Sequence, residues 1–558
     1  MQLNGSDILM ECLLEQGVDT VFGYPGGAVL NIYDALYKYS DRITHILTAH
    51  EQGAAHAADG FARATGKVGV CIATSGPGAT NLVTGIATAY MDSIPVVAIT
   101  GNVPVSQLGR DSFQEIDITG VTMPITKHNF IVKDVRELAD TVRKAFEIAK
   151  SGRPGPVLID IPKDVSAAVT AYEKAGASVR RVVPAPKEER IENALAIIAS
   201  CEKPLIYFGG GVISSGAEES LARFAKEQDI PVCSSMMGLG CFDPADPLWL
   251  GMVGMHGTVA SNRAAKECDA LFVCGARFSD RVAGDRTGFA PNAKVIHIDV
   301  DHAEFDKNVT ATVRIGGELK TVLEALCDRS EHHTHTAWCA RAAAWKKAVP
   351  ASVQGADEAP DPRVILETLR TLVDDDTVIA TDVGQHQMWT AQYFEVRRPR
   401  KLLTSGGLGT MGYGLGAAIG AQCGTNNKRT VLITGDGSFH MNCNELTTLA
   451  SYNLPVTVLV FDNRVLGMVR QWQKVFYGRR FSATDPERRT DFVKLAEAYG
   501  CKGLYMNTAA DVERVLKEAL SADGPVVVDC RLSKDVNVLP MIPPGKTVDD
   551  IIEAMEEE

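Results

Sequence analysis

Two oxygen-bearing side chains follow apolar runs in the C-terminal third of the chain, at a spacing that suits a shared cation. Asp436 lies between two glycines directly after residues 430–434, and Asn463 follows residues 456–461. The segment between them carries apolar residues at roughly helical spacing, so we predict a strand–loop–helix–strand unit of a parallel sheet. Carboxylate and amide oxygens at neighbouring strand ends can bind Mg²⁺, which in turn can hold a diphosphate. An ordinary turn is the alternative for the Gly-Asp-Gly tripeptide alone, but Asn463, 27 positions later, favours the cation site.

A third oxygen-bearing side chain, Glu51, begins an alanine-rich segment in the N-terminal third. It lies in His50-Glu51-Gln52-Gly53, where an extended segment is expected to turn into a helix over residues 54–63. As an acid at a helix N-terminus, Glu51 would simply complement the helix dipole. As a carboxylate enclosed by small apolar residues, it could share a proton with a ligand nitrogen. The residues alone leave both interpretations open.

Length, composition and charge narrow the class of protein. A chain of 558 residues is too long for one hydrophobic core, so we predict three domains. The 50 glycines and 45% hydrophobic content are typical of an α/β enzyme with many tight turns. The net charge of -13, without a basic cluster, argues against nucleic acid or an anionic membrane as a partner.

Cysteine usage and the lack of targeting signals indicate the cellular compartment of the protein. The 13 cysteines include no CxxC pair, so we expect buried thiols in a reducing compartment rather than disulfides or zinc ligands. We find no signal-peptide pattern and no apolar run of about 18 residues. A cytoplasmic location without a membrane span is therefore expected.

Alternating strand and helix patterns divide the chain into α/β units. We predict domains over residues 1–170, 188–325 and 361–535, a C-terminal tail over 536–558 that ends in an acidic helix, and linkers over 170–190 and 326–360. The second linker contains His332, His333 and His335, for which a solvated connector is expected rather than a metal site.

The middle domain contains a possible phosphate-binding turn. Its first strand, 204–208, ends in Gly209, Gly210 and Gly211, although the pattern is not GxGxxG. A later strand ends in Asp299, whose carboxylate could bind a ribose hydroxyl. The spacing leaves two alternatives open for this domain, one that binds a nucleotide and one that does not.

Taken together, these motifs resemble those of a known family. Gly435-Asp436-Gly437 followed by Asn463 is similar to the thiamine-diphosphate motif, and residues 50–54 are similar to the activating-glutamate segment of that superfamily. Essentially the whole chain then resembles the catalytic (large) subunit of biosynthetic acetolactate synthase (acetohydroxyacid synthase). The matching segments are residues 24–28, 151–156, 254–257, 382–389, 405–414, 467–472 and 541–545.

The resemblance implies a fold and a reaction. Two thiamine-diphosphate domains, of PYR and PP type, would flank a Rossmann-like FAD-binding middle domain. The enzyme would decarboxylate pyruvate and join the remaining two-carbon unit to a second 2-ketoacid. Pyruvate as acceptor gives 2-acetolactate and 2-ketobutyrate gives 2-aceto-2-hydroxybutyrate, the first common step of valine, leucine and isoleucine biosynthesis. The implied cofactors are thiamine diphosphate, Mg²⁺ and FAD. The implied assembly is a homodimer or homotetramer with shared active sites, partnered by a small regulatory subunit.

The resemblance also implies roles for individual residues. Metal ligands would be Asp436, Asn463 and the carbonyl of Val465. Thiamine diphosphate contacts would be Gly384, Gln385, His386, Gly409, Met411, Gly435, Gly437, Ser438, Gly467 and Met468. Glu51 of the partner subunit would share a proton with the cofactor's aminopyrimidine, and Met411 would support its bent shape. Substrate contacts would be Arg281, Phe113, Met255, Trp472, Gln114 and Lys163, with Arg281 on the acceptor carboxylate and Trp472 setting the preference for 2-ketobutyrate. FAD contacts would be Arg153, Gly209, Gly210, Gly211, Met255, His256, Arg277 and Asp299.

Two departures from the family pattern and three rival functions stand beside this interpretation. At residues 462–466 the chain has Asp-Asn-Arg-Val-Leu, where the family commonly has Asn-Asn-Glu-Glu-Gln. It also has Ser279 where an aspartate is common. The rivals are a pyruvate oxidase or simple 2-ketoacid decarboxylase, an FAD-free catabolic acetolactate synthase, and a non-catalytic nucleotide-binding regulator. Arg281, Trp472 and the Pro543-Pro544-Gly545 tail favour ligation over the first rival.

Overall fold

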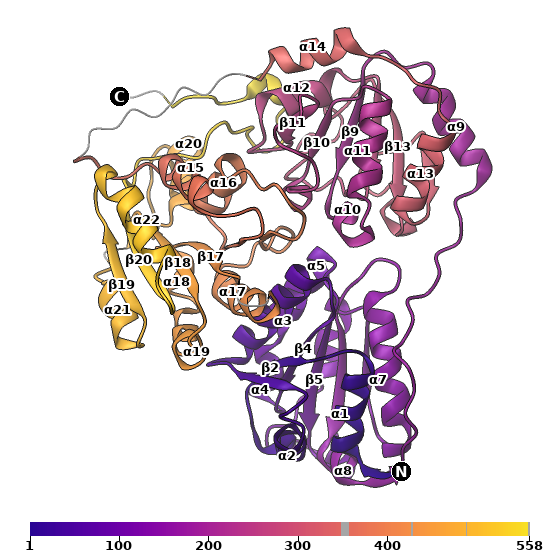
Figure 1. Ribbon diagram of the computed structural model, residues 1–558, viewed down its shortest axis with the longest axis vertical. Coiled ribbons are helices and arrows are strands. Elements are labelled where there is room, and N and C mark those ends of the chain that lie inside the picture. Colours follow the sequence, from indigo (N-terminus) through magenta and orange to yellow (C-terminus); the bar gives the residue numbers. More distant parts are fainter. Residues whose placement is uncertain (347–356, 426–427, 487, 556–558) are drawn as a thin grey trace.

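The computed structural model describes residues 1–346, 357–425, 428–486 and 488–555, which form three α/β domains arranged in a triangle (Figure 1). Each domain is built on one six-stranded parallel sheet, which confirms the predicted α/β class with three parallel-sheet domains. A further pair of short strands, β1 (Gln2–Asn4) and β8 (Val169–Ala171), is antiparallel and joins the two ends of the first domain.

The N-terminal sheet has the order β3-β2-β4-β5-β7-β6. Its strands are β2 (Thr20–Gly23), β3 (Thr44–Leu47), β4 (Gly69–Ala73), β5 (Val96–Asn102), β6 (His128–Ile131) and β7 (Val157–Pro162). Its helices are α1 (Gly5–Glu15), α2 (Leu30–Lys38), α3 (Glu51–Thr65), α4 (Pro77–Asn81), α5 (Val83–Asp92), α6 (Ile118–Thr122), α7 (Val135–Lys150) and α8 (Lys163–Ala167). β4, β5 and β7 are buried along their whole length, as expected for a parallel sheet covered on both faces.

The C-terminal sheet has the order β16-β15-β17-β18-β20-β19, which is the N-terminal topology repeated. Its strands are β15 (Val378–Thr381), β16 (Leu402–Leu403), β17 (Thr430–Gly435), β18 (Val456–Asp462), β19 (Lys502–Met506) and β20 (Val526–Arg531). Its helices are α15 (Pro362–Leu372), α16 (Gln385–Tyr393), α17 (Tyr413–Gly424), α18 (Asp436–Phe439), α19 (Leu446–Ser451), α20 (Gly467–Phe476), α21 (Phe492–Ala498) and α22 (Val512–Leu520).

The middle sheet differs, with the order β11-β10-β9-β12-β13-β14. Numbered within the domain, its strands follow 3-2-1-4-5-6, which is the Rossmann order. The strands are β9 (Pro204–Phe208), β10 (Val232–Ser234), β11 (Trp249–Met252), β12 (Ala270–Cys274), β13 (Lys294–Asp299) and β14 (Val313–Gly316). The helices are α9 (Glu188–Ile198), α10 (Gly210–Ser215), α11 (Glu218–Glu227), α12 (Val259–Glu267), α13 (Leu319–Arg329) and α14 (Thr336–Ala344).

The N- and C-terminal domains share a hydrophobic core through α3 and α17. Alanines and glycines on both helices allow the two backbones to approach closely. An added Cβ on Gly60 would overlap the backbone of Ala417, and one on Gly420 would overlap the carbonyl of Ala57. The small residues of α3 therefore fix how the two domains sit together.

Gly420→Ala is expected to lower the free energy of unfolding by about 1–3 kcal/mol. The overlap with the Ala57 carbonyl outweighs the helix-propensity gain of about 1 kcal/mol. Urea denaturation measures the change. Gly176→Ala, whose Cβ would meet no atom within 4 Å, is the control. Equal unfolding midpoints for the two variants would contradict the packing argument.

Three local expectations are wrong. The predicted single helix after Asp436 is split into α18, a 3-10 turn and α19. The predicted second linker, part of which lies outside the described residues, contains the end of α13 and all of α14. His335 is buried there and its Nδ1 lies 2.8 Å from the Gln228 carbonyl, so it is not solvated. The acidic end of the tail forms only a 3-10 turn at Val548–Asp550 in its described part.

The absences predicted from composition can be compared with the described residues. All 13 cysteines are free, and Cys71, Cys274 and Cys530 are buried in strands as expected. No helix of the described residues is long and apolar enough to span a membrane. Within the same residues, no group of three or more His, Cys, Asp or Glu side chains could hold a metal ion.

Candidate functional site

Asp436 and Asn463 lie at the carboxyl ends of the adjacent strands β17 and β18. Gln385, the first residue of α16, contacts Asn463, because its Oε1 accepts a hydrogen bond from Asn463 Nδ2 at 3.1 Å. The other atom of that amide, Oδ1, accepts from the N–H of Val465 at 3.2 Å. The Asp436 carboxylate, this amide oxygen and the Val465 carbonyl are oxygen atoms of the kinds that a hard cation prefers.

Glycines allow close approach at this strand edge. A Cβ on Gly435 would lie 2.7 Å from His386 Nδ1, and one on Gly467 would overlap the side chain of Gln385. Ser438 Oγ donates to the Val383 carbonyl at 2.7 Å, which joins α18 to the turn after β15. The site therefore combines the ends of three neighbouring strands, β15, β17 and β18.

The charge state of this edge suits a bound cation beside a polar ligand atom. Burial, aided by the Asp462 carboxylate, raises the pKa of Asp436 to about 7, although Arg488 opposes the shift. A cation would offset this repulsion and favour the ionised form. Burial lowers the pKa of His386 to about 3, and its Nε2 has no partner among the described residues. A neutral imidazole with an unpaired buried nitrogen fits a polar ligand atom.

A cavity of about 1650 Å³ begins beside this edge and is lined by residues of all three domains. The predicted site residues that line it are Gly384, Gly409, Met411, Met468, Arg153, Gly209, Gly210, Gly211, Met255, His256, Arg277, Asp299, Arg281 and Trp472. Gly409 has a φ of +69°, a conformation that glycine adopts without strain, and its carbonyl lies in the turn before α17.

Arg281 and Trp472 form one end of the cavity. The Arg281 guanidinium lies over the Trp472 ring, 5.8 Å from its centre, and the Arg281 side chain is 61% exposed. The carbonyl of Arg281 accepts from the N–H of Met255 at 2.8 Å, so all three residues share this end. An accessible guanidinium beside an apolar ring suits a small carboxylic acid with an alkyl group.

The middle-domain side of the cavity is built around a glycine turn. The N–H of Gly211 donates to the Gly275 carbonyl at 2.9 Å, and a Cβ on Gly209 would lie 2.8 Å from that oxygen. Arg277 follows β12, and Asp299 is the last residue of the neighbouring strand β13. The arrangement lies at the carboxyl edge of a Rossmann-order sheet, which is where dinucleotides bind.

Charged and unpaired groups complete this side of the cavity. Burial raises the pKa of Asp299 to about 6. Arg153 reaches in from the N-terminal domain, donating to Glu304 at 2.7 Å and to Asp301 at 3.2 Å. His256 Nδ1 is buried without a partner among the described residues, although His256 lines the cavity. These groups offer both anion-binding and hydroxyl-binding contacts.

Four predicted substrate or catalytic residues do not line this cavity: Glu51, Phe113, Gln114 and Lys163. Phe113 is 88% exposed, and Lys163 is exposed at the start of α8. Gln114 packs its backbone against Gly76. All four belong to the N-terminal domain, whereas most of the cavity lining comes from the other two domains.

Glu51 is buried against residues of its own domain. It is the first residue of α3 and only 9% exposed, and its Oε2 accepts from Asn81 Nδ2 at 3.0 Å. Its Oε1 would lie 3.1 Å from a Cβ on Gly78. A helix-dipole acid needs neither burial nor an amide partner, so these contacts favour the proton-sharing interpretation.

Sequence reasoning missed Glu445, which supports the Glu51 segment from the C-terminal domain. Its buried carboxylate accepts from the N–H of Ala49 and the N–H of His50, both at 3.0 Å, and from the hydroxyl of Thr448 at 2.6 Å. Burial raises the pKa of this carboxyl group. The contact joins residues separated by 396 positions, so no local pattern could reveal it.

The two departures from the family pattern can be placed. Leu466 Cδ2 would lie 2.7 Å from a Cβ on Gly437, so an apolar side chain lies directly on the Gly-Asp-Gly turn. Ser279 lines the cavity and its carbonyl accepts from the N–H groups of Val282 and Ala283 at 3.0 and 2.8 Å. The backbone of Ser279, and not its side chain, thus shapes the turn that carries Arg281.

Comparison with known proteins identifies relatives along the whole chain. Residues 3–121, 191–326 and 382–530 match, in that order, the N-terminal TPP binding domain, the central domain and the C-terminal TPP binding domain of thiamine pyrophosphate enzymes. The chain is 48% identical over 571 residues to a probable acetolactate synthase large subunit of Methanocaldococcus jannaschii, covering 100% of this chain and 96% of that protein. It is 45% identical over 556 residues to the acetolactate synthase isozyme 2 large subunit of Escherichia coli, covering 99% and 100%. An acetolactate synthase of Arthrospira platensis is 46% identical over 573 residues, with 99% and 98% covered.

Proposed function

Because this chain belongs to the acetolactate synthase large-subunit family of thiamine pyrophosphate enzymes, we propose that two copies of it jointly form each active site. The family assigns the activity: the chain is a thiamine-diphosphate-dependent carboligase that decarboxylates pyruvate and joins the two-carbon unit to a second 2-ketoacid. When bound, thiamine diphosphate supplies the nucleophilic carbon for both steps.

One edge of the C-terminal sheet would hold the diphosphate end of the cofactor. Asp436, Asn463 and the Val465 carbonyl provide oxygen ligands for Mg²⁺, which binds the diphosphate in turn. His386 Nε2, buried and without a partner among the described residues, would contact a diphosphate oxygen. Met411 and the Gly409 carbonyl would contact the other end, since both line the adjoining cavity.

Glu51 would come from the second copy. In its own chain Glu51 does not line the cavity that contains Met411, Arg281 and Trp472, and this observation carries the proposal. The Glu51 carboxyl would share a proton with the N1′ nitrogen of the aminopyrimidine, held in place by Asn81. The copy that supplies Glu51 would also supply Phe113, Gln114 and Lys163, since these residues too lie outside their own chain's cavity. They would reach the end of the cavity where Arg281 and Trp472 bind the acceptor 2-ketoacid.

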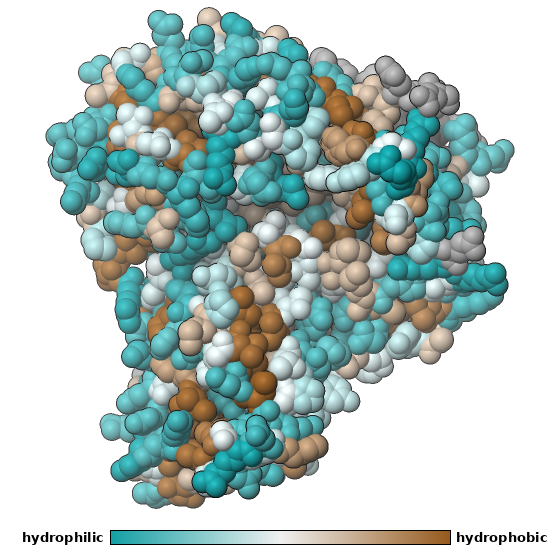
Figure 2. Space-filling view, turned by 180° about the vertical axis from the view of Figure 1, so that it is seen from behind, coloured by the Kyte–Doolittle hydropathy of each residue, from teal (hydrophilic) through white to brown (hydrophobic). Residues whose placement is uncertain are grey.

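Exposed apolar side chains support association. Figure 2 shows a band of apolar residues over the N-terminal domain. Large apolar side chains that are exposed in one copy include Tyr90 (38%), Phe113 (88%), Val121 (41%), Met123 (67%), Leu408 (44%) and Met441 (57%). Exposed apolar surface of this kind is typical of an interface. A homodimer would cover it, and two dimers could form a tetramer.

We also propose FAD as the ligand of the middle-domain side of the cavity. The Rossmann strand order, the glycine turn at Gly209–Gly211 and the cations Arg153 and Arg277 suit a dinucleotide diphosphate. Asp299 would accept from a ribose hydroxyl and His256 Nδ1 would gain its missing partner. This gives the functional domains 1–170, 188–325 and 361–535 and the tail 536–558. Within the tail, the N–H of Ile542 donates to the Met255 carbonyl of the middle domain at 2.8 Å.

Two further parts of the proposal concern the surroundings of the enzyme. The relatives are named large subunits, so we include a small regulatory subunit as a partner. The 13 free cysteines suit the reducing cytoplasm.

Trp472→Leu is expected to lower the preference for 2-ketobutyrate over pyruvate by roughly 10-fold while acetolactate formation continues. The indole provides a broad apolar face beside Arg281, and the extra methylene of 2-ketobutyrate gains most from that face. Competition between both acceptors at fixed pyruvate measures the product ratio. Phe476→Leu, one turn further along α20, is the control, and an unchanged ratio in Trp472→Leu would contradict the assignment.

The product assay tests the activity itself. The purified protein is incubated with pyruvate, thiamine diphosphate, Mg²⁺ and FAD. Acetolactate supports the assignment, whereas acetaldehyde, or acetate with electron transfer to a dye, would indicate a decarboxylase or oxidase. Full activity of a colourless protein without FAD would remove FAD from the proposal and favour the catabolic type of synthase.

A further inference from the structure

The loop over residues 404–412, between β16 and α17, carries Gly409 and Met411 on its cavity side. Its residues 406–409 are exposed, whereas Thr404, Ser405 and Thr410 are buried. A glycine-rich loop samples many conformations unless other groups hold its backbone. In this structure Gln387 and Asp382 of the C-terminal domain bind the Ser405 carbonyl and the Gly412 N–H, and the N–H groups of Gly406 and Gly407 are bound from the N-terminal domain of the same chain.

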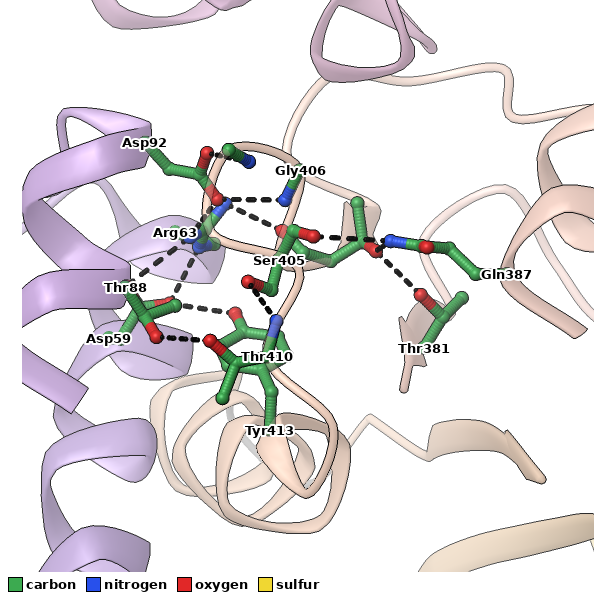
Figure 3. A network of polar contacts seen from close by, with 12 residues as sticks. Asp59, Arg63, Thr88, Asp92, Thr381, Gln387, Ser405, Gly406, Thr410 and Tyr413 are labelled. Atoms are coloured by element: carbon green, nitrogen blue, oxygen red, sulfur yellow. Dashed lines mark hydrogen bonds and ion pairs between the residues drawn. The ribbon is translucent and has the colours of Figure 1, made fainter. Parts of the chain in front are cut away.

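Arg63 of α3 and Asp92 of α5 bind the backbone of this loop (Figure 3). Arg63 Nη1 donates to the Thr404 carbonyl at 3.0 Å, and its Nη2 donates to Asp92 Oδ2 at 2.9 Å. The Asp92 carboxylate accepts from the N–H of Gly406 at 3.0 Å and from the N–H of Gly407 at 2.7 Å. Thr404, Gly406 and Gly407 of the loop are thus held by one ion pair.

We call the Arg63–Asp92 ion pair and its contacts with the loop the clamp. Two neighbouring contacts extend the clamp to the end of the loop. Asp59 accepts from Arg63 Nε at 2.6 Å and from the Tyr413 hydroxyl at 2.7 Å, which orients both groups. The hydroxyls of Thr88 and Thr410 lie 2.8 Å apart (Figure 3). The loop is therefore held on both sides of Gly409, where an added Cβ would meet no atom within 4 Å.

The clamp is buried and more acidic than basic. The side chains of Asp59 and Asp92 are 0% exposed and that of Arg63 is 6% exposed. A buried cluster of two carboxylates and one guanidinium gains little stability over an apolar core, because removing the charges from water is costly. Fixing a specific loop conformation accounts for the cluster better than stability does.

We propose that Arg63 and Asp92 are positioning residues that fix the Gly409–Met411 segment and thereby the bend of the thiamine diphosphate bound in the same chain. The proposal rests on the proposed function, which assigns these two loop residues to the cofactor. Helix α3 then serves two cofactors. Its first residue, Glu51, acts on the one in the partner copy, and Arg63, roughly 18 Å further along, supports the one in its own chain.

Asp92→Asn and Thr88→Val test the clamp. Asn keeps the shape of Asp92 but loses the charge and one of the two acceptors for the loop N–H groups. Thr88→Val is a milder change that keeps the volume and removes only the hydroxyl contact. Glu15→Gln is the matched control, because Glu15 forms a buried bidentate pair with Arg143, both contacts at 2.9 Å, outside the cavity.

The first readout is hydrogen exchange of residues 404–412 in the full-length protein without cofactor. Asp92→Asn is expected to speed exchange at Gly406 and Gly407 by roughly 10-fold or more, since their N–H groups lose an ionised acceptor. Glu15→Gln is expected to leave this segment unchanged. Equal exchange of this segment in the wild type, Asp92→Asn and Glu15→Gln would overturn the proposal.

The second readout separates cofactor binding from turnover. With Mg²⁺ present, calorimetry is expected to give a thiamine diphosphate Kd within about 3-fold of the wild type, because the diphosphate ligands are intact. The kcat is expected to fall roughly 10- to 100-fold in Asp92→Asn and about 3- to 10-fold in Thr88→Val. Turnover equal to that of Glu15→Gln in both variants would overturn the proposal. Wild-type protein that makes no acetolactate would instead overturn the proposed function, whereas the exchange result stands without it.

Discussion

Glu51→Gln is expected to lower kcat by about 10²- to 10³-fold, with little change in the affinity for thiamine diphosphate. Gln keeps the size of Glu51 and can still bond to Asn81, but it cannot share a proton with the aminopyrimidine nitrogen. The diphosphate ligands lie on another domain and are untouched. Steady-state kinetics and calorimetry with thiamine diphosphate and Mg²⁺ separate the two effects.

The matched control for this prediction is Glu137→Gln. Glu137 is also an acid in the first turn of a helix in the N-terminal domain, but it is exposed. If Glu51 only complemented its helix dipole, both substitutions would change stability by similar small amounts and neither would change turnover. Turnover of Glu51→Gln equal to that of Glu137→Gln would contradict the proton-sharing role.

Asp436→Ala is expected to weaken Mg²⁺-dependent binding of thiamine diphosphate by at least about 100-fold. It removes the only carboxylate among the proposed metal ligands. The wild-type melting temperature is expected to rise when thiamine diphosphate and Mg²⁺ are added, because ligand binding stabilises the folded state. The Asp436→Ala protein is expected to show no such rise. Since burial disfavours the charged carboxylate, the variant without cofactor is not expected to be less stable.

Asp160→Asn provides the control for Asp436→Ala. Asp160 is also a buried aspartate near the carboxyl end of a parallel strand, and burial raises its pKa to about 7. It is bound by Thr100 and Asn102, so the substitution is expected to lower stability but to keep the thermal response to cofactor. A cofactor response that persists in Asp436→Ala would contradict the metal site.

The sequence predicts the parts of the site that follow from strand topology. Asp436 and Asn463 had to meet because parallel strands present their carboxyl ends at one edge, and the structure places them there. Alternating apolar runs likewise predict three parallel sheets. The burial of Glu51 followed only from the resemblance and from its small neighbours.

The contacts that the sequence did not predict join residues far apart in the chain. Glu445 binds the Glu51 segment across 396 positions, and Arg63 binds Thr404 across 341. An isolated glutamate or arginine on a helix has no local pattern that names its partner. The expectation that His335 is solvated is wrong for the same reason. Its burial depends on backbone carbonyls more than 100 positions away.

A mixing experiment with the two inactive variants tests the central claim most directly. If each site combines Asp436 of one chain with Glu51 of another, a hybrid of Glu51→Gln and Asp436→Ala chains contains one intact site and one doubly altered site. Dissociation, mixing and reassembly of equal amounts is then expected to restore roughly a quarter of wild-type acetolactate synthesis, because half of the dimers are hybrids. Activity that stays at the level of the separate variants, with hybrid dimers shown to be present, would contradict the shared site.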